Sequence, residues 1–292
     1  MNWLGLRRFS YAISLIFILT GLLAIIRGGL QPALEFTGGS ELVLQTATPV
    51  DQLDATLREV ADSQEPITIE NLTQQNNNEV QLQLAEISSE EKTAYVNAVQ
   101  EKLNQPVTEI RFQSIGPAVS RDLIVKTLYA IGLGIISILA YLWWQFKNWR
   151  YGLAGVLAMI HDSLILLGSF AWLGLIWHVK VDLLFVTALL TTLSFSVHDT
   201  IVIFDRIREL QKTNRQGVTL ADLANTAVTQ TLPRSLNNSL TIIFMLVVLL
   251  ALGGETLRWF TAALLIGTIT GTYSSTFTAV PLYFDLQKRF DK

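Results

Sequence analysis

Six long apolar stretches constrain the fold of this chain more than any other feature of its sequence. A helix needs roughly 20 apolar residues to cross the hydrocarbon layer of a bilayer, and each stretch is close to that length. Charged residues make up only 15% of the chain, and they gather at about 50–110 and in the short gaps between the apolar stretches. We therefore predict transmembrane helices at residues 9–27, 122–144, 151–176, 182–204, 236–253 and 259–284.

The first apolar stretch follows Arg7 and Arg8, as the core of a signal peptide follows its basic residues. Its length of about 18 residues exceeds that of a usual signal core. No small-x-small cleavage motif comes after it, because Arg27 and two glycines stand there. We therefore predict that this stretch is retained as the first helix.

Lys and Arg residues of the short connections fall mostly on one side of the predicted bundle, and such residues mark the cytoplasmic side. That side would hold Arg7, Arg8, Lys147, Arg150, Arg206, Arg208, Lys212, Arg215, Arg234, Lys288, Arg289 and Lys292. The short loops of the other side would hold Lys180 and Arg258, with Arg27 at a helix end. We expect both termini in the cytoplasm, and residues 30–120 in the periplasm or an equivalent space. The membrane would be the cell inner (plasma) membrane or a thylakoid-type membrane.

Residues 40–115 have the pattern of a domain that folds in water. Glu41 to Gln45 and Val80 to Leu84 alternate apolar and polar residues, which predicts half-buried strands. Two helical stripes follow the first and third strands, and Ser88 with Glu91 matches a capping box. The resulting order β-α-β-β-α-β is the ferredoxin-like arrangement. This domain is either a spacer or a surface that handles a partner or an emerging polypeptide.

The predicted fold class is therefore a membrane protein: an all-α six-helix transmembrane bundle with an inserted α+β, ferredoxin-like extracytoplasmic domain. Residues 1–29 form the N-terminus and the first span, and residues 30–120 form the inserted domain. Residues 121–292 form the other five spans, with a cytoplasmic loop at about 206–234.

An acidic residue lies inside the fourth predicted span, where an ionisable group is costly and is therefore a functional candidate. Asp199 belongs to a mostly polar helical stripe with Thr192, Ser196 and Ile203. Burial favours a neutral carboxyl group, whereas a nearby cation favours the carboxylate, so a carboxyl group balanced between the two can load and release a proton. We expect Arg234, at the start of the fifth span, to be that cation. The alternative is a static buried ion pair that holds two helices together.

The third span carries His161 and Asp162, also in its cytoplasmic half. His161 is either a member of a proton relay or a hydrogen-bonded packing residue. We group His161 and Asp162 with Asp199 and Arg234 as candidate proton-coupling residues. His198 neighbours Asp199 but points about 100° away on a helix, which favours a helix contact.

Paired charges end the fourth span at Asp205, Arg206 and Arg208. They form either an ordinary solvated helix end or a hinge or docking site for a partner. Small residues crowd the last span, where Gly267 and Gly271 have the spacing that lets helix backbones approach closely. These small residues favour packing, with the lining of a hydrated path as the alternative.

The sequence also argues against several classes of function. It contains no cysteine, which excludes disulfides, thiolate catalysis and cysteine-bound zinc. A net charge of −3 offers no broad basic surface for nucleic acid. No Walker loop is present, and no His/Glu spacing indicates a metal site. No Ser, His and Asp residues lie at the same predicted depth in the membrane, as a catalytic triad would require. We therefore expect neither an enzyme nor a cofactor.

Five sequence motifs follow one another in the order of a known membrane-protein family. They are Leu34 to Gly39 (LDFTGG in the family), Ile115 to Val119 (VGPxV), Ala158 to Asp162 (the HD motif), Phe195 to Glu209 (YSINDTIVVFDRIRE) and Thr229 to Ser235 (TQTLxRS/T). The chain thus resembles, over nearly its whole length, the SecF side of the SecD/SecF family of bacterial protein export, which belongs to the RND superfamily. The structural residues of the first two motifs are Gly38, Gly39, Gly116 and Pro117. Glu35, His198 and Ser120 depart from the residues usual in the family.

The resemblance implies an accessory role in protein export that is driven by proton flow. It places the proton-responsive pair at Asp199 and Arg234. The implied partners are a SecD-like subunit, the SecYEG channel, unfolded preprotein and membrane lipid. Two other functions stay open: a proton-linked exporter subunit of the same superfamily for small molecules or lipids, and a non-transporting scaffold of the export channel.

Overall fold

The structure is a computed structural model that describes residues 2–46, 50–63, 67–76, 79–146, 148–213 and 217–290. Lys147, Arg215 and Lys292, which we used to predict orientation, lie outside these residues. The chain divides into two compact units. The helical unit consists of Met1–Gln31 and Tyr129–Lys292, and the sheet unit consists of Pro32–Leu128.

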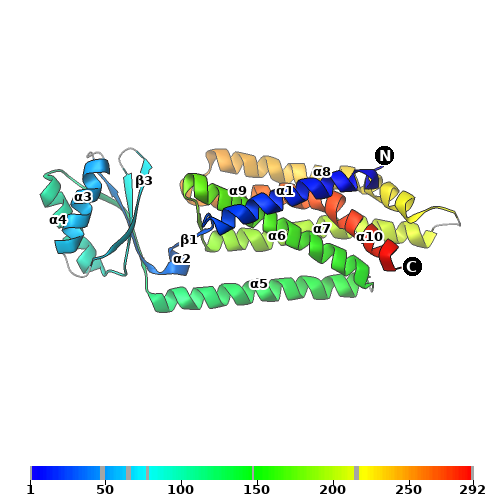
Figure 1. The fold of residues 1–292 in the computed structure, drawn as a ribbon, viewed down its shortest axis with the longest axis horizontal. Coiled ribbons are helices and arrows are strands. Elements are labelled where there is room, and N and C mark those ends of the chain that lie inside the picture. The colour runs from blue at the N-terminus through cyan, green and yellow to red at the C-terminus, as the bar shows by residue number, and fades with distance from the viewer. Residues whose placement is uncertain are drawn as a thin grey trace. The chain divides into compact units, whose positions relative to one another are not determined.

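Long helices make up the helical unit, and Figure 1 shows them running lengthwise. They are α1 (Arg7–Ile26), α6 (Trp149–Trp177), α7 (Leu183–Thr213), α8 (Leu220–Leu252), α9 (Glu255–Ser274) and α10 (Val280–Phe290), preceded by a short 3₁₀ turn, η1 (Leu4–Leu6). A π-helical turn, η2 (Ser275–Ala279), joins α9 to α10. The helix α5 (Pro117–Phe146) contributes residues to both units. Two-residue strands lie at β1 (Gln31–Pro32) and β6 (Lys180–Val181).

Five helical segments are long and apolar enough to cross a membrane. They are Leu4–Ile26, Pro117–Phe146, Trp149–Trp177, Leu183–Thr213 and Leu220–Leu252. The sixth predicted span falls on α9, η2 and α10, which are helical but rich in Thr, Ser and Gly and therefore less apolar. Five of the six predicted spans are thus confirmed as apolar helices, and the sixth stays a prediction.

Two of these helices continue well beyond the predicted spans. The predicted fourth span ends at 204 and the fifth begins at 236, whereas α7 reaches Thr213 and α8 begins at Leu220. The expected loop at 206–234 is therefore helical over much of its length. The prediction was too short because helix outside the apolar layer carries polar residues and leaves no hydropathy signal.

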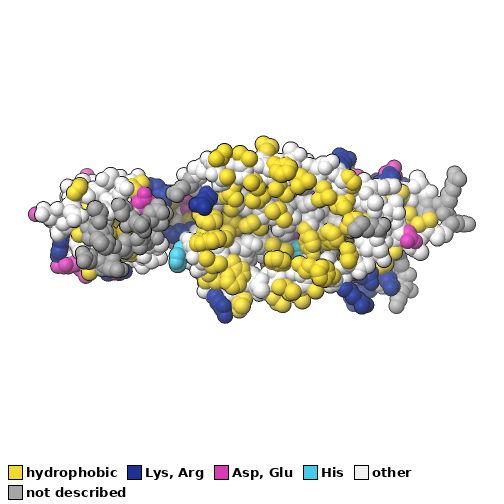
Figure 2. All heavy atoms as spheres, turned by 90° about the horizontal axis from the view of Figure 1, so that it is seen from above, with side chains coloured by type: hydrophobic (Ala, Val, Ile, Leu, Met, Phe, Trp, Pro, Cys, Tyr) yellow, Lys and Arg dark blue, Asp and Glu magenta, His cyan; other side chains and the backbone are white. Residues whose placement is uncertain are grey.

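The helical unit exposes many large hydrophobic side chains on α1, α5 and α8. Figure 2 shows such side chains covering its long side, with Lys and Arg side chains toward its ends. In water a patch of this size would be costly, whereas it suits contact with lipid tails. Together with the five apolar helices, this surface identifies a multi-pass membrane protein.

Small residues let the helices of this unit approach closely. A Cβ atom added to Gly21 of α1 would lie 2.7 Å from the Cα atom of Gly168 on α6. A Cβ atom added to Gly271 of α9 would lie 3.1 Å from the Cβ atom of Ser196 on α7, and one on Gly267 would overlap the Thr192 side chain. Close approach of this kind is typical of membrane helices. Gly267 and Gly271 thus lie at close contacts between α9 and α7.

The sheet unit begins with α2 (Leu34–Thr37) and then follows the predicted order β-α-β-β-α-β. Its elements are β2 (Gly39–Gln45), α3 (Val50–Ser63), β3 (Ile69–Asn76), β4 (Glu79–Leu84), α4 (Ser89–Leu103) and β5 (Thr108–Ile115). The strands lie in the order β3-β4-β2-β5, and every neighbouring pair is antiparallel.

An apolar core holds the sheet unit together. Alternate residues of the strands, such as Leu42 and Leu82, are fully buried against Leu57 of α3 and Tyr95 of α4. The Tyr95 hydroxyl donates a hydrogen bond to the backbone carbonyl of Leu57 at 3.0 Å, so its polar end is satisfied. The predicted capping box is confirmed, because Ser88 and Glu91 satisfy each other's backbone N–H groups at the start of α4.

The glycines of the first two motifs have structural roles in the sheet unit. Gly38 and Gly39 both have positive φ angles, and a Cβ atom on Gly39 would lie 2.7 Å from the Leu84 carbonyl oxygen. Gly116 leaves room for the Glu86 carboxylate, which would lie 2.8 Å from an added Cβ atom. Pro117 is the first residue of α5, a position where its missing N–H group is not needed.

Candidate functional site

A buried carboxylate joins three helices in the middle of the helical unit. Asp162 of α6 is only 5% exposed. Its Oδ2 atom accepts hydrogen bonds from Ser196 of α7 at 2.5 Å and from Ser274 of α9 at 2.6 Å. Its Oδ1 atom lies 2.9 Å from Nδ1 of His161. Hydrogen bonds to a charged oxygen are short and strong, so this carboxylate holds α6, α7 and α9 together.

His161 extends this cluster to the first helix. Its Nε2 atom lies 2.8 Å from the Ser14 hydroxyl of α1, and its ring lies near that of Tyr273, with centroids 6.4 Å apart. One turn earlier on α1, the Ser10 hydroxyl donates to the carbonyl of Phe277 at 2.6 Å. Phe277 lies in the π-helical turn, a feature frequently found at functional sites. His161 therefore bridges Asp162 and α1, which is compatible with both of its predicted roles.

Asp199 is a second buried carboxylate, 7% exposed and also on α7. The hydroxyl of Ser235 on α8 donates to its Oδ2 atom at 2.5 Å. Ser196 lies three residues before Asp199, so both share one face of α7. Through these contacts the polar cluster reaches five helices: α1, α6, α7, α8 and α9.

The expected ion pair between Asp199 and Arg234 is not formed in this structure. Within the residues that the structure describes, Arg234 makes no ion pair, and its side chain is exposed. Arg234 and Ser235 are adjacent, so their side chains point about 100° apart on α8. Ser235 occupies the face toward α7, and Arg234 therefore points elsewhere. The expected pair is therefore absent from this structure, and the role of Arg234 in proton coupling stays a prediction.

The helix-end charges of α7 make contacts with neighbouring helices. Asp205 accepts a hydrogen bond from the side chain of Gln145 at 3.2 Å, and Arg208 donates to the Gln145 carbonyl at 2.8 Å. Arg206 donates to Gln230 of α8 at 2.7 Å and pairs with Glu209 at 2.5 Å. The motif therefore ties α7 to α5 and α8.

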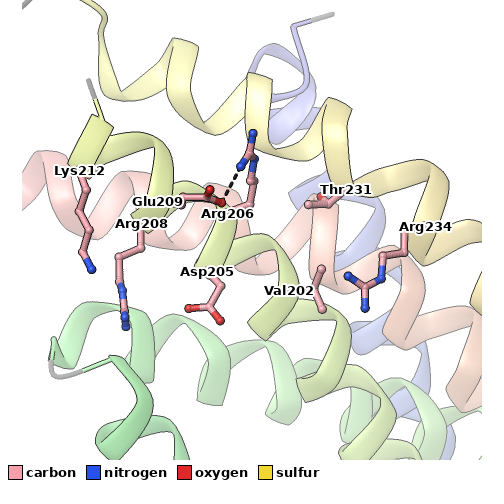
Figure 3. A pocket seen from close by; sticks show the side chains of 8 residues that line it. All are labelled: Val202, Asp205, Arg206, Arg208, Glu209, Lys212, Thr231 and Arg234. Atoms are coloured by element: carbon pink, nitrogen blue, oxygen red, sulfur yellow. Dashed lines mark hydrogen bonds and ion pairs between the residues drawn. The ribbon is translucent and has the colours of Figure 1, made fainter. Parts of the chain in front are cut away.

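A cavity opens beside these charges, and Figure 3 shows the side chains that surround it. Its lining residues are Val202, Asp205, Arg206, Arg208, Glu209, Lys212, Thr231 and Arg234. Arg234 enters it from α8, and Asp205, Arg208 and Lys212 project from α7. The cavity thus contains Arg234 and the three residues of the predicted helix-end motif.

Several residues of the polar cluster escaped the sequence analysis as site residues. Ser14 and Ser274 are hydroxyl residues in predicted spans, and such hydroxyls usually bond their own backbone. The available signal was spacing, because Ser10 and Ser14 stand one turn apart on a mostly apolar helix. Gln145 carried a weaker signal, as an amide at the end of an apolar span.

Comparisons with known proteins find relatives that match most of this chain. The family described as "Protein export membrane protein SecD/SecF, C-terminal" matches residues 95–289. A protein translocase subunit SecF of Thermobaculum terrenum is 38% identical over 282 residues, which cover 92% of this chain and 88% of that one. The SecF of Synechocystis sp. is 35% identical over 262 residues, covering 87% of this chain and 82% of that one.

Solved structures of SecDF are also similar to this chain. The crystal structure of SecDF from Thermus thermophilus, a translocon-associated membrane protein, has a TM-score of 0.82 at 29% identity. A SecDF structure in the super-membrane-facing form has a TM-score of 0.67 at 28% identity. The matched regions cover 99% and 100% of this chain but only 39% of each SecDF chain, so the solved protein is much longer. This chain belongs to the SecD/SecF family of protein-export membrane proteins, as a SecF-type subunit of the Sec pathway.

Proposed function

We propose that the chain uses the proton motive force, together with a SecD-like partner, to promote late steps of preprotein translocation. The observation that carries the proposal is the pair of buried carboxylates, Asp162 and Asp199, held by hydroxyl groups of neighbouring helices. Acidic groups within membrane helices are costly and commonly belong to ion or proton pathways.

Each carboxylate links its protonation state to helix packing. The Oδ2 atom of Asp162 accepts two hydroxyl hydrogen bonds, and protonation of this carboxylate would weaken its hold on Ser196 and Ser274. Protonation of Asp199 would likewise weaken its hydrogen bond with Ser235, and so loosen α7 from α8. A rotation of α8 by about 100° would then bring Arg234 toward Asp199. In that state Arg234 would pair with the Asp199 carboxylate once it has lost its proton. His161 would pass protons between Asp162 and α1.

The energy available is adequate for such movements. One elementary charge that crosses 100 mV releases about 2.3 kcal/mol. A change of a few hydrogen bonds, each worth about 1 kcal/mol net, lies within that range. One or two protons per cycle would therefore suffice to shift α7 against its neighbours and to move the inserted domain.

The proposed assembly places this chain in a larger complex. The SecDF chain of Thermus thermophilus is more than twice as long as the matched region, which supports a SecD-like partner for this shorter chain. We further propose six spans, both termini in the cytoplasm and a ferredoxin-like domain on the outer side of a plasma or thylakoid-type membrane. That domain would hold the emerging polypeptide near SecYEG and prevent backsliding.

The test compares Asp199→Asn and Asp162→Asn with Asp122→Asn. Asp122 forms an exposed i,i+4 ion pair with Lys126 at 2.6 Å and serves as the matched control. The measurement is proton-driven preprotein transport into inverted membrane vesicles, together with co-purification of the SecD-like subunit. We expect at least a tenfold loss of the proton-dependent rate for the two buried residues, unchanged assembly, and no effect of the control.

Two other results would replace this proposal. Unchanged transport in all three variants, with assembly intact, would indicate a scaffold. A proton-linked drug or lipid phenotype with normal preprotein transport would indicate an exporter subunit.

A further inference from the structure

The cavity at the end of α7 and α8 carries more positive than negative charge. It has a volume of about 500 Å³, within the range of small-ligand sites. Four cations line it, Arg206, Arg208, Lys212 and Arg234, against the two acids Asp205 and Glu209. The cations come from both helices, so an anion bound here would contact α7 and α8 together (Figure 3).

Internal contacts leave part of this positive charge uncompensated. Glu209 pairs with Arg206, and Asp205 accepts from the neutral Gln145 side chain. Arg208 donates to a backbone carbonyl, which is a neutral acceptor. Among the residues that the structure describes, Lys212 and Arg234 have no acidic partner. Arg208, Lys212 and Arg234 therefore remain available to an external anion.

Beyond the cavity, α8 exposes apolar side chains on the face of Arg234. Met245 and Val248 stand 11 and 14 residues after Arg234, so they lie on about the same helical face, and their exposed fractions are 70% and 57%. Val202 supplies an apolar wall inside the cavity itself. In the predicted topology the cavity lies where the apolar parts of α7 and α8 end, which is the depth of the cytoplasmic headgroups. A cationic cavity above an apolar helix face matches a ligand with an anionic head and a hydrocarbon tail.

We propose that this cavity binds the phosphate of an anionic phospholipid through Arg208, Lys212 and Arg234, with one acyl chain along the exposed face of α8. Arginine forms paired hydrogen bonds with phosphate oxygens, and lysine adds a point charge. A soluble acidic peptide would satisfy the cations but would not use the apolar face. This site goes beyond the proposed proton-driven function and does not depend on it.

The experiment uses the full chain in a mild detergent and native mass spectrometry with added lipid. Dioleoylphosphatidylglycerol is compared with dioleoylphosphatidylcholine, and inorganic phosphate is added as a competitor. The variant Arg208→Gln/Lys212→Gln removes two cavity cations. The matched control Lys288→Gln/Arg289→Gln removes two exposed cations at the end of α10. A cation near the surface contributes about fivefold to the binding of anionic lipid, so the cavity variant should bind phosphatidylglycerol roughly 25-fold more weakly.

The control variant should bind the lipid nearly as well as the unmodified chain. Equal losses in both variants, or equal binding of the two lipids, would overturn the proposal in favour of nonspecific surface charge. Displacement of the lipid by millimolar inorganic phosphate would overturn it in favour of a free-anion site. Displacement of the lipid by an added acidic peptide, but not by phosphate, would overturn it in favour of a partner protein.

A second measurement guards against misfolding of the cavity variant. A photoreactive residue at Val202 in the otherwise unmodified chain should crosslink to phosphatidylglycerol, and the same residue at the exposed Leu22 of α1 should not show this headgroup preference. Absence of the preference at position 202 would contradict the proposal without any charge substitution.

Discussion

Both units of this chain bury large apolar side chains, but the helical unit also buries small and polar residues where its helices meet. The sheet unit buries Leu42, Leu57, Leu82 and Tyr95, and its exterior is largely polar. Where α7 meets α9, the helical unit instead buries small and polar residues, including Thr192, Ser196, Gly267 and Gly271, while large apolar residues of α1, α5 and α8 face outward.

This difference follows from the solvent that surrounds each unit. In water, removal of apolar surface drives folding, so large side chains go inside. In lipid the surrounding tails are as apolar as leucine, and helices associate through close packing and hydrogen bonds. The buried carboxylates fit this second case, because their hydroxyl partners come from three different helices, α7, α8 and α9. Polar groups therefore contribute directly to helix packing in the helical unit.

The largest expected effect is that of Leu57→Ala in the sheet unit. Leu57 is fully buried, and loss of such a side chain costs about 2–5 kcal/mol of the free energy of unfolding. Hydrogen exchange of peptides from residues 32–128 in the full chain measures this cost. Phe244→Ala is the matched control in the helical unit, because the Phe244 side chain is 65% exposed on α8. Its loss should leave hydrogen exchange of the helical unit unchanged. A comparable loss in both variants would contradict the contrast between the units.

A smaller effect is expected for Gly168→Leu in the helical unit. The added side chain would meet the backbone of Gly21 and push α1 from α6, at a cost of about 1–3 kcal/mol. Thermal unfolding in lipid nanodiscs measures it. Gly132→Leu on α5 is the control, because no atom lies within 4 Å of a Cβ atom added there. If Gly132→Leu proved as damaging as Gly168→Leu, the close helix crossing would not explain the loss.

Ser274→Ala tests the polar contribution to the same unit. It removes one of two hydroxyl donors to Oδ2 of Asp162 and should cost about 0.6–2 kcal/mol. Ser163→Ala removes a hydroxyl that donates to the carbonyl of Met159 on its own helix, and should cost less. The same unfolding assay compares the two. A larger loss for Ser163→Ala would show that local helix bonds outweigh bonds between helices.

The smallest effect concerns the pH dependence of the sheet unit. Hydrogen bonds from the Ser88 backbone and side chain lower the pKa of Glu91 below its ordinary value of 4.5. The ionised carboxylate therefore stabilises the folded unit above pH 4.5, and this contribution is lost as pH falls through the lowered pKa. Glu91→Gln keeps an acceptor at the capping box but cannot titrate in this range. Hydrogen exchange at the start of α4 should depend less on pH in this variant between pH 3 and 6, and an unchanged pH profile would refute the assignment.

Hydropathy and alternation predicted much of the architecture, because each reports a local property of the chain. Five spans, the strand and helix order of the sheet unit and the Ser88–Glu91 capping box all depend on residues within one element. The early start of α8 was missed because residues 220–235 lie in a polar helix, which a hydropathy pattern does not distinguish from a loop.

The site was only partly predictable because its contacts depend on how helices are turned about their axes. Asp162 and Asp199 were identified from their cost in a membrane, but the partners Ser14 and Ser274 come from helices distant in the sequence. Ser235, and not Arg234, is the neighbour of Asp199. The two residues are adjacent on α8, and their side chains differ by about 100° in direction around the helix axis. Spacing within one helix gives relative directions, whereas only tertiary packing gives the absolute direction.

The π turn at Ser275–Ala279 has a consequence for the end of the chain. It holds one residue more than an α turn, so everything beyond it is rotated by about 100° relative to an uninterrupted helix. In that setting Tyr283 stacks on Tyr151 with centroids 4.1 Å apart, and Asp285 lies 3.2 Å from Arg7. The extra residue thus sets the rotation of α10 about its axis, and this rotation directs Tyr283 toward α6 and Asp285 toward α1. Deletion of a single residue from the turn would preserve helicity on both sides and yet detach the C-terminal segment from α6 and α1.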